Sequence, residues 1–326
     1  MPDATKTATD EPWKGEAKVR ELVQQGDLDA AVAAAKQAVR DNAAEPLRRE
    51  TLFNLMCLTG QWESAFRQAQ TIGQMDQARV SESAAWQAAI AGEQGRIGVW
   101  SGKRKPTILG EPTEWVGILA AAVEKLVAGD ADAAKRLRGE AMGRAADAVE
   151  DAAASGELWT HEATQPEAFA GWYDADDRLG PVIELFADGE YAWAPPGAIA
   201  DIRMQPPASL RDLVWQPAVA TWAAGGTTGV LLPARYFGTE TGDADANLKL
   251  ARGTDFRQPT DGYNVGVGQR LWITIADDDS ETDRPLLSIG RVRYGIADDL
   301  PPPDPGLQGM DMGGGLSTPS AGGNGA

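Results

Sequence analysis

Two groups of carboxylates are the residues of this sequence that could do chemistry. One group is Asp174, Asp176 and Asp177, and the other is Asp277, Asp278, Asp279, Glu281 and Asp283. Clustered carboxylates can bind calcium, or can act as the acid and the base of a glycoside hydrolase when a cleft holds them several ångströms apart. The second group lacks the glycine and the terminal glutamate of an EF-hand loop. We therefore expect both groups to be solvated hairpin tips, and a carboxylate-dependent hydrolase is the alternative.

The chain contains a single cysteine and a single histidine, Cys57 and His161. A zinc site needs several such ligands, and Cys57 has no partner for a disulfide. Cys57 lies in the apolar run LFNLMCL, which predicts a small buried side chain rather than a nucleophile. His161 has no catalytic context and is expected at the surface or at a domain boundary. We thus predict no catalytic residue, no metal site and no cofactor.

The segment VGVGQR, residues 265–270, contains a Gly-x-Gly motif that could suggest a nucleotide-binding loop. Such a loop needs a strand before it and a helix after it. Here LWITIA follows, which has the pattern of a strand. The motif therefore predicts a loop that enters a strand, with glycines where the backbone bends or approaches another segment.

The chain carries a formal net charge of −18 at pH 7. This charge repels a phosphate backbone, so we expect no nucleic-acid partner and no binding to a membrane. The tight basic cluster of this acidic chain is Lys103, Arg104 and Lys105. We expect a solvated loop there, and a contact with a partner protein or an ATPase is the alternative.

The stretch SLRDLVWQPA places an Arg-Asp pair directly before an apolar run. Arg211 and Asp212 could form a charged pair at the lip of a pocket. They could instead orient the turn into a strand while Trp215 and Pro217 pack beneath it. An exposed ion pair contributes about 0–1 kcal/mol, whereas replacing a buried Trp by Ala costs roughly 3–5 kcal/mol. We favour the structural interpretation.

The length of 326 residues, with 43% hydrophobic residues and 11 Trp, predicts two globular domains. Near Ser155 the amino-acid composition changes from an Ala-rich helical pattern to runs of aromatic residues interrupted by prolines. We expect a flexible N-terminus (1–15), a helical domain (16–155), a C-terminal α/β domain (156–299) and a disordered Pro/Gly-rich tail (300–326). The N-terminus lacks the features of a signal peptide, and no run reaches the about 18 apolar residues of a membrane span. A cytoplasmic protein is expected.

An internal echo runs through the helical part: GDLDAA begins at Gly26, GQWESA at Gly60 and GDADAA at Gly129. The first two are 34 residues apart (60 minus 26), which is the period of tetratricopeptide helix pairs. Apolar residues recur every three or four positions over residues 28–39 and 52–72. Stacked helix pairs are therefore predicted, and such pairs present grooves that suit an amphipathic helix.

The stack of helices is expected to break at residues 95–112. This segment, GRIGVWSGKRKPTILGEP, contains too many glycines and prolines for a helix interior. The next copy of the repeated motif should fall in this segment but is poorly preserved there, so a loop is predicted in its place.

Strand-like alternation dominates the second half of the chain. The candidate strands are residues 180–186, 191–194, 199–204, 218–222, 229–232, 248–251, 270–275 and 286–292. The pair within VIELFADGEYAW is the clearest hairpin, because Asp188 and Gly189 can supply the positive φ angles that a tight turn requires.

Two parts of the sequence resemble the ImpE family, also called TagJ. Residues 26–76, with LFNLMCLTGQWESA at their centre, are similar to the helical half of the family, and residues 169–277 are similar to its C-terminal half. The matching phrases of the second half, in family order, are DDRLGPVIELFADGEYAWAP, LRDLVWQPA, GVLLPARYFG, LKLARGTDF and GVGQR. The chain departs from the family pattern at residues 96–112, in the Ala-rich insert before Ser155 and in the tail.

The resemblance implies an α+β fold, with a tetratricopeptide-like helical repeat domain followed by a compact C-terminal α/β domain rich in antiparallel strands. It also implies a non-enzymatic adaptor of bacterial type VI secretion systems. Members of the family bind the N-terminal helix of the small sheath subunit TssB and are associated with ClpV, the ATPase that disassembles the sheath. The alternatives are the hydrolase and a generic tetratricopeptide scaffold with an unrelated C-terminal domain.

Overall fold

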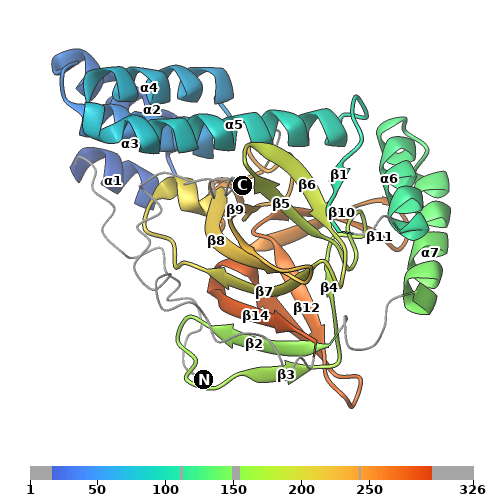
Figure 1. Cartoon of the computed structure of the whole chain (residues 1–326). Coiled ribbons are helices and arrows are strands. Elements are labelled where there is room, and N and C mark those ends of the chain that lie inside the picture. Colours follow the sequence, from blue (N-terminus) through green and yellow to red (C-terminus); the bar gives the residue numbers. More distant parts are fainter. Residues whose placement is uncertain (1–16, 111–112, 149–154, 242–243, 296–326) are drawn as a thin grey trace, which may run out of the picture.

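Helices form the first part of the molecule and mainly antiparallel strands form the second (Figure 1), so the predicted α+β class is confirmed. The computed structural model describes residues 17–110, 113–148, 155–241 and 244–295. The predicted flexible N-terminus and Pro/Gly-rich tail lie outside these residues. No helix in the described part of the chain is long and apolar enough to cross a membrane.

The first part begins with a layer of helices that turn back and forth. They are α1 (Ala17–Gln24), α2 (Leu28–Asp41), α3 (Pro46–Leu58), α4 (Trp62–Met75), the 3-10 turn η2 (Gln77–Arg79) and α5 (Val80–Trp100). The glycines of the sequence echo follow helix ends, with φ of 79° at Gly26, 69° at Gly60 and 82° at Gly129. Glycine adopts this left-handed conformation without a steric penalty, so the echo marks where helices stop.

Helix α5 continues without a break to Trp100, so the prediction of a loop over residues 95–100 is wrong. Gly92 and Gly95 serve close packing on the sheet rather than helix termination. A Cβ atom on Gly92 would lie 2.7 Å from Cγ of Phe186, and one on Gly95 would lie 3.1 Å from Cβ of Tyr191. The loop begins only after Trp100, and from there the chain enters the short strand β1 (Thr107–Ile108).

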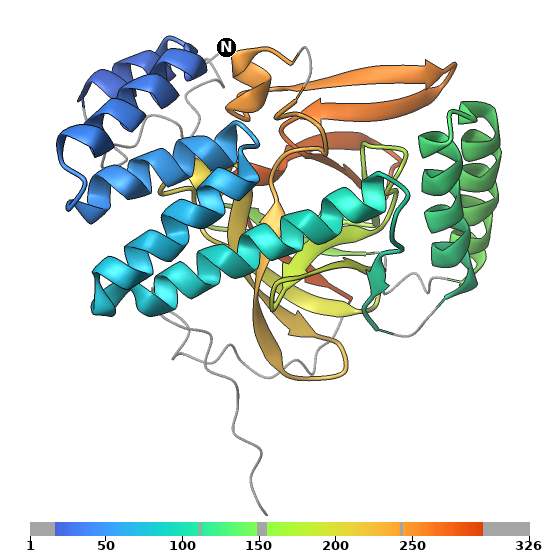
Figure 2. The same cartoon turned by 90° about the horizontal axis from the view of Figure 1, so that it is seen from above.

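Helices α6 (Glu114–Val127) and α7 (Ala131–Ala148) form a separate antiparallel pair at one side of the sheets (Figure 2). Polar contacts join α7 to loops of the strand-rich part. Arg138 forms an ion pair with Asp177 at 2.6 Å, and Lys135 Nζ donates a hydrogen bond to the carbonyl of Asp261 at 2.5 Å.

The main sheet has nine strands in the order β1-β6-β5-β9-β8-β7-β14-β2-β3, and only the β1–β6 pair is parallel. Besides β1, they are β2 (Gly156–Thr160), β3 (Glu167–Phe169), β5 (Ile183–Ala187), β6 (Glu190–Ala194), β7 (Ile199–Met204), β8 (Trp215–Trp222), β9 (Thr227–Pro233) and β14 (Ile289–Tyr294). The predicted β5–β6 hairpin is confirmed, with φ of 50° at Asp188 and 77° at Gly189. Because β1 comes from the chain between α5 and α6, the sheet includes a strand of the helical part.

Two smaller sheets complete the second part, one of β10 (Thr254–Thr260) with β11 (Tyr263–Gly268), and one in the order β13-β12-β4. The latter strands are β13 (Glu281–Pro285), β12 (Leu271–Ile275) and β4 (Gly171–Asp174), and the short helices are η3 (Leu210–Leu213), α9 (Ala246–Lys249) and η4 (Leu286–Ser288). The strand predicted at residues 248–251 is wrong. Asp245 accepts a hydrogen bond from the backbone N–H of Leu248 at 2.9 Å, which starts a helical turn instead.

One continuous apolar core joins the helices to the sheet. Trp62 at the start of α4 stacks on Trp215 of β8 with ring centroids 5.5 Å apart, and Cys57 is fully buried as expected. Helix α3 contacts η3, and α5 lies across β5 and β6 (Figure 2). The inner face of α3 and α5 is therefore filled by the chain's own second part and does not form the open groove expected from the repeat.

We predict that Gly92→Ala lowers the free energy of unfolding by about 1–3 kcal/mol, because the added methyl group overpacks the contact with Phe186. Urea denaturation followed by circular dichroism measures the change. Gly139→Ala in α7 is the matched control, since a Cβ there meets nothing within 4 Å. The control should be neutral or stabilising, as Ala favours a helix by about 1 kcal/mol over Gly. Equal stability of both variants would contradict the packing role of Gly92.

Candidate functional site

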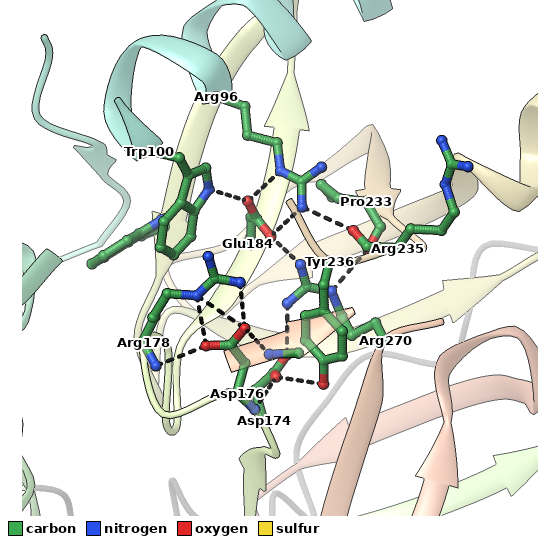
Figure 3. A network of polar contacts seen from close by, with 12 residues as sticks. Arg96, Trp100, Asp174, Asp176, Arg178, Glu184, Pro233, Arg235, Tyr236 and Arg270 are labelled. Carbon is green, nitrogen blue, oxygen red and sulfur yellow. Dashed lines mark hydrogen bonds and ion pairs between the residues drawn. The ribbon is translucent and has the colours of Figure 1, made fainter. Parts of the chain in front are cut away.

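Charged side chains from distant parts of the sequence meet beneath α5 (Figure 3). At the centre lies Glu184 of β5. Its Oε1 accepts hydrogen bonds from Arg96 Nε at 2.6 Å, Trp100 Nε1 at 3.0 Å and the Tyr191 hydroxyl at 2.8 Å. Its Oε2 accepts from Arg96 NH2 at 3.2 Å and contacts Arg270 NH2. One carboxylate thus binds helix α5 and the segment that enters β12.

Arg270 connects Glu184 to a second buried carboxylate, Asp174 at the end of β4. Arg270 NH1 donates to Asp174 Oδ2 at 2.6 Å, and Nε donates to the Pro233 carbonyl at 2.9 Å. The Tyr236 hydroxyl donates to Asp174 Oδ1 at 3.0 Å. Each end of the Arg270 guanidinium therefore has an acceptor, which is the condition for burying such a charge.

A third carboxylate, Asp176, binds the neighbouring Arg178. The shortest contact joins Arg178 NH2 to Asp176 Oδ2 at 2.5 Å, and the backbone N–H of Gly266 donates to the same oxygen at 2.9 Å. The Arg178 guanidinium lies 4.6 Å from the centre of the Trp100 ring. The set that these contacts connect, named the Glu184 network below, consists of Arg96, Trp100, Asp174, Asp176, Arg178, Glu184, Tyr191, Tyr236 and Arg270.

The surroundings move the pKa values of the two central carboxylates in opposite directions. Burial opposes the ionised form of Glu184, but Arg96 and Arg270 outweigh it and lower the pKa to about 2. At Asp174 burial dominates and raises the pKa to about 6, although Arg270 acts in the opposite direction. Asp174 therefore takes up a proton at a higher pH than Glu184 does.

The first carboxylate group of the sequence is not a solvated hairpin tip, so that expectation is wrong. Asp174 and Asp176 are 1% and 0% exposed. The arginine that binds Asp174 lies 96 residues further along the chain, so local spacing could not reveal the pair. The second group matches the expectation: Asp277, Asp278 and Asp279 are exposed in the turn between β12 and β13.

The geometry of the Glu184 network suits assembly of the fold rather than catalysis. A general base must reach a substrate proton, yet these carboxylates are buried and already bound by arginines or donor side chains. Among the described residues, no group of three or more His, Cys, Asp or Glu side chains is placed to hold a metal ion. Removing one partner of a buried ion pair costs about 3–5 kcal/mol, because it leaves the other charge unpaired.

The two residues of the Arg-Asp motif, Arg211 and Asp212, have different roles in the structure. Asp212 Oδ2 accepts hydrogen bonds from the backbone N–H groups of Ala208 and Ser209, both at 2.9 Å, and so caps η3. Arg211 reaches across to Glu50 of α3 at 3.2 Å, whereas its contact with Asp212 is 3.8 Å long. The turn and the α3 contact are thus fixed by separate side chains.

Trp215, the aromatic residue of the same motif, is buried, and its Nε1 donates to Glu93 of α5 at 2.8 Å. Pro217 is half-buried in β8. Arg235 is buried nearby and donates from NH1 to the carbonyls of Leu58 at 3.0 Å and Lys249 at 2.5 Å. These carbonyls lie at the C-terminal ends of α3 and α9, where a cation is favoured.

The remaining sequence candidates are not members of the Glu184 network. Lys103, Arg104 and Lys105 are exposed in the loop after α5, and the nearest acidic partner in the described chain is Glu124, 3.8 Å from Lys105 Nζ. His161 is half-buried, and burial lowers its pKa. The sequence did contain one signal for the network: Glu184 interrupts the apolar run VIELF, where a buried strand requires a partner for any charge.

The fold and the network define a protein in which helices are fixed on a mainly antiparallel sheet through buried ion pairs. Residues 166–293 match the family model described as ImpE protein. The chain is 38% identical over 259 residues to the type VI secretion system accessory component TagJ of Pseudomonas aeruginosa, which covers 79% of this chain and 86% of TagJ. The chain therefore belongs to the ImpE/TagJ family, which confirms the resemblance read from the sequence.

The same fold occurs in a solved structure. The crystal structure of protein VPA1032 from Vibrio parahaemolyticus superposes with a TM-score of 0.72 at 21% identity. The match covers 85% of this chain and 97% of that one. All five phrases of the second half that carried the resemblance contribute residues to the polar contacts described above, namely Glu184, Asp212, Arg235, Lys249 and Arg270.

We predict that Asp174 makes stability fall as the pH rises from 4 to 6. Its pKa of about 6 exceeds the usual 3.8, so in this range the folded state binds a proton that the unfolded state has released. The contribution is fully present below pH 3.8 and is lost as the pH rises through about 6. Asp174→Asn removes this contribution. The free energy of unfolding of the variant should therefore fall less steeply than that of the wild type as the pH rises from 4 to 6.

Urea denaturation at a series of pH values measures the two slopes. Asp277→Asn is the matched control, because Asp277 is exposed and its substitution leaves the Glu184 network untouched. A wild-type slope equal to that of Asp174→Asn over this range would contradict the raised pKa.

Proposed function

We propose that this chain is an accessory protein of a bacterial type VI secretion system and works by binding other proteins rather than by catalysis. The observation that carries the proposal is the 38% identity to TagJ over 259 residues. The buried ion network supports the non-enzymatic role, because Asp174 and Asp176 are bound by arginines inside the fold. The alternative carboxylate-dependent hydrolase would need such side chains at a substrate cleft.

The proposed partner is the N-terminal helix of the small sheath subunit TssB, and the proposed setting is ClpV-dependent sheath disassembly in the cytoplasm. The inner face of α3 and α5 is occupied by the chain's own sheet part. A partner helix must therefore bind elsewhere on the surface. An amphipathic helix needs apolar side chains to receive its anchors.

Exposed apolar side chains are concentrated at one end of the helical layer. Leu47 lies in the first turn of α3, Met75 is the last residue of α4 and Val80 is the first of α5. Consecutive antiparallel helices place these three positions at the same end. The remaining large exposed apolar residue of the described chain, Val127, lies on α6. We name Leu47, Met75 and Val80 the stack-end patch and propose that it binds the TssB helix.

The basic loop of Lys103, Arg104 and Lys105 is a second proposed contact, with the ATPase ClpV as its partner. The loop is exposed and lies after α5, at the end opposite to Val80, so both partners could bind at once. Its positive charge suits an acidic surface.

We predict that the stack-end variant Leu47→Ser, Met75→Ser, Val80→Ser weakens binding of a synthetic peptide covering the N-terminal helix of the cognate TssB by at least about tenfold, because anchor contacts dominate such interfaces. Isothermal titration calorimetry with the full chain measures the affinity, and a scrambled peptide tests specificity. Val127→Ser is the matched control and should bind as the wild type does.

Two results would count against this proposal in different ways. If the native and scrambled peptides behave alike with the wild-type chain, TssB is not the partner of this surface. If the native peptide binds and the stack-end variant retains full affinity, TssB is bound at another surface.

A further inference from the structure

The face of the main sheet on which α4 and α5 pack also carries, on β2, β7 and β14, an ordered set of basic and aromatic side chains. Along β7 and β14, Ile202 and Val292 pair with each other and are buried on the opposite face. The residues next to them point to the other face, where Arg291 lies between Arg203 of β7 and Trp159 of β2 in the strand register. Alternation along the strands thus brings these three side chains into one row.

Two of the arginines share a buried carboxylate. Asp201, which is 5% exposed, accepts from Arg203 Nε at 3.1 Å and from Arg291 Nε at 2.7 Å and NH2 at 2.5 Å. The Arg203 hydrogen bond to Asp201 comes from Nε. The Arg203 and Arg291 guanidinium groups are therefore held in place by a carboxylate on the same face, while 29–33% of their side-chain surface stays exposed.

Trp159 and Arg293 extend this set. The Arg291 guanidinium lies 4.9 Å from the centre of the Trp159 ring, so the two side chains stack. Arg293, two residues further along β14, is 33% exposed and lies 3.8 Å from Glu157. Arginine and tryptophan are the residues most enriched among side chains that dominate binding energies. Side chains that are ordered before binding lose less entropy when a partner arrives.

The charge of this surface is opposite to that of the molecule. This surface carries three guanidinium groups and two carboxylates, those of Asp201 and Glu157, whereas the whole chain has a formal net charge of −18. The half-buried Val219 of β8, which is paired with Arg203, continues the face onto the neighbouring strand. The face therefore combines positive charge with apolar area.

We propose that this surface, named the arginine face and made of Trp159, Arg203, Arg291 and Arg293, binds an acidic segment of a partner protein. Carboxylates of the segment bind the guanidinium groups, and its apolar side chains cover Trp159 and Val219. Guanidinium groups bind carboxylates in a fork that lysine does not reproduce. The arginine face lies on β2, β7 and β14, whereas the stack-end patch lies on α3, α4 and α5, so the two surfaces share no element.

The test uses the full chain with 15N-labelled tryptophan and a fluorescein-labelled synthetic peptide rich in glutamate with interspersed leucines. We expect saturable binding that weakens as salt is added, and a shift of the Trp159 indole resonance, which Trp159→Phe identifies. The variant Arg203→Gln, Arg291→Gln, Arg293→Gln should bind at least about tenfold more weakly. The control Arg40→Gln, Arg67→Gln, Arg257→Gln changes exposed arginines elsewhere by the same charge and should bind within about twofold of wild type.

The triple variant leaves Asp201 buried without its arginines, so a second variant keeps the test independent of folding. Trp159→Phe with Arg293→Glu retains both Asp201 contacts and should also weaken binding. The proposal is overturned if the peptide does not bind, or if a peptide with lysine in place of glutamate binds equally well. It is also overturned if the arginine-face triple variant and the control triple variant lose the same affinity. A dimer in sedimentation velocity that the arginine-face variants dissociate would also overturn it, because the occupant would then be a second copy of the chain.

Discussion

A buried carboxylate held between two guanidinium groups determines how the helices sit on the sheet. Glu184 is the point where α5, through Arg96 and Trp100, meets the segment entering β12, through Arg270. Such an arrangement is stable only when every donor and acceptor is satisfied, since an unpaired buried charge costs several kcal/mol. The geometry of one carboxylate therefore constrains the position of the long helix and of two sheets together.

The close approach of α5 to the sheet follows from the same constraint. The glycines of α5 bring its backbone near Phe186 and Tyr191, and Tyr191 in turn donates to Glu184. With α3 and α5 bound to the sheet in this way, the repeat-like helices have no free inner face.

The sequence predicted those features that depend on local chemistry. The echo at Gly26, Gly60 and Gly129 marked helix ends, and Asp188-Gly189 marked a hairpin, because a positive φ angle is a property of one or two residues. Features set by distant contacts were missed. Gly95 looked like part of a loop because the Tyr191 that it contacts lies far along the chain, and Asp174 looked solvated because its partner is Arg270. The apolar setting of Glu184 was the one local sign of the network.

The central claim is that the helical layer and the sheet unfold as one unit because the Glu184 network joins them. Native-state hydrogen exchange at increasing urea concentration tests it most directly, by comparing backbone amides of α5 with those of β5. The network requires both sets to exchange through one opening with the same free energy, equal to that of global unfolding. Exchange of the α5 amides through an opening of clearly lower free energy, while β5 stays protected, would contradict the claim.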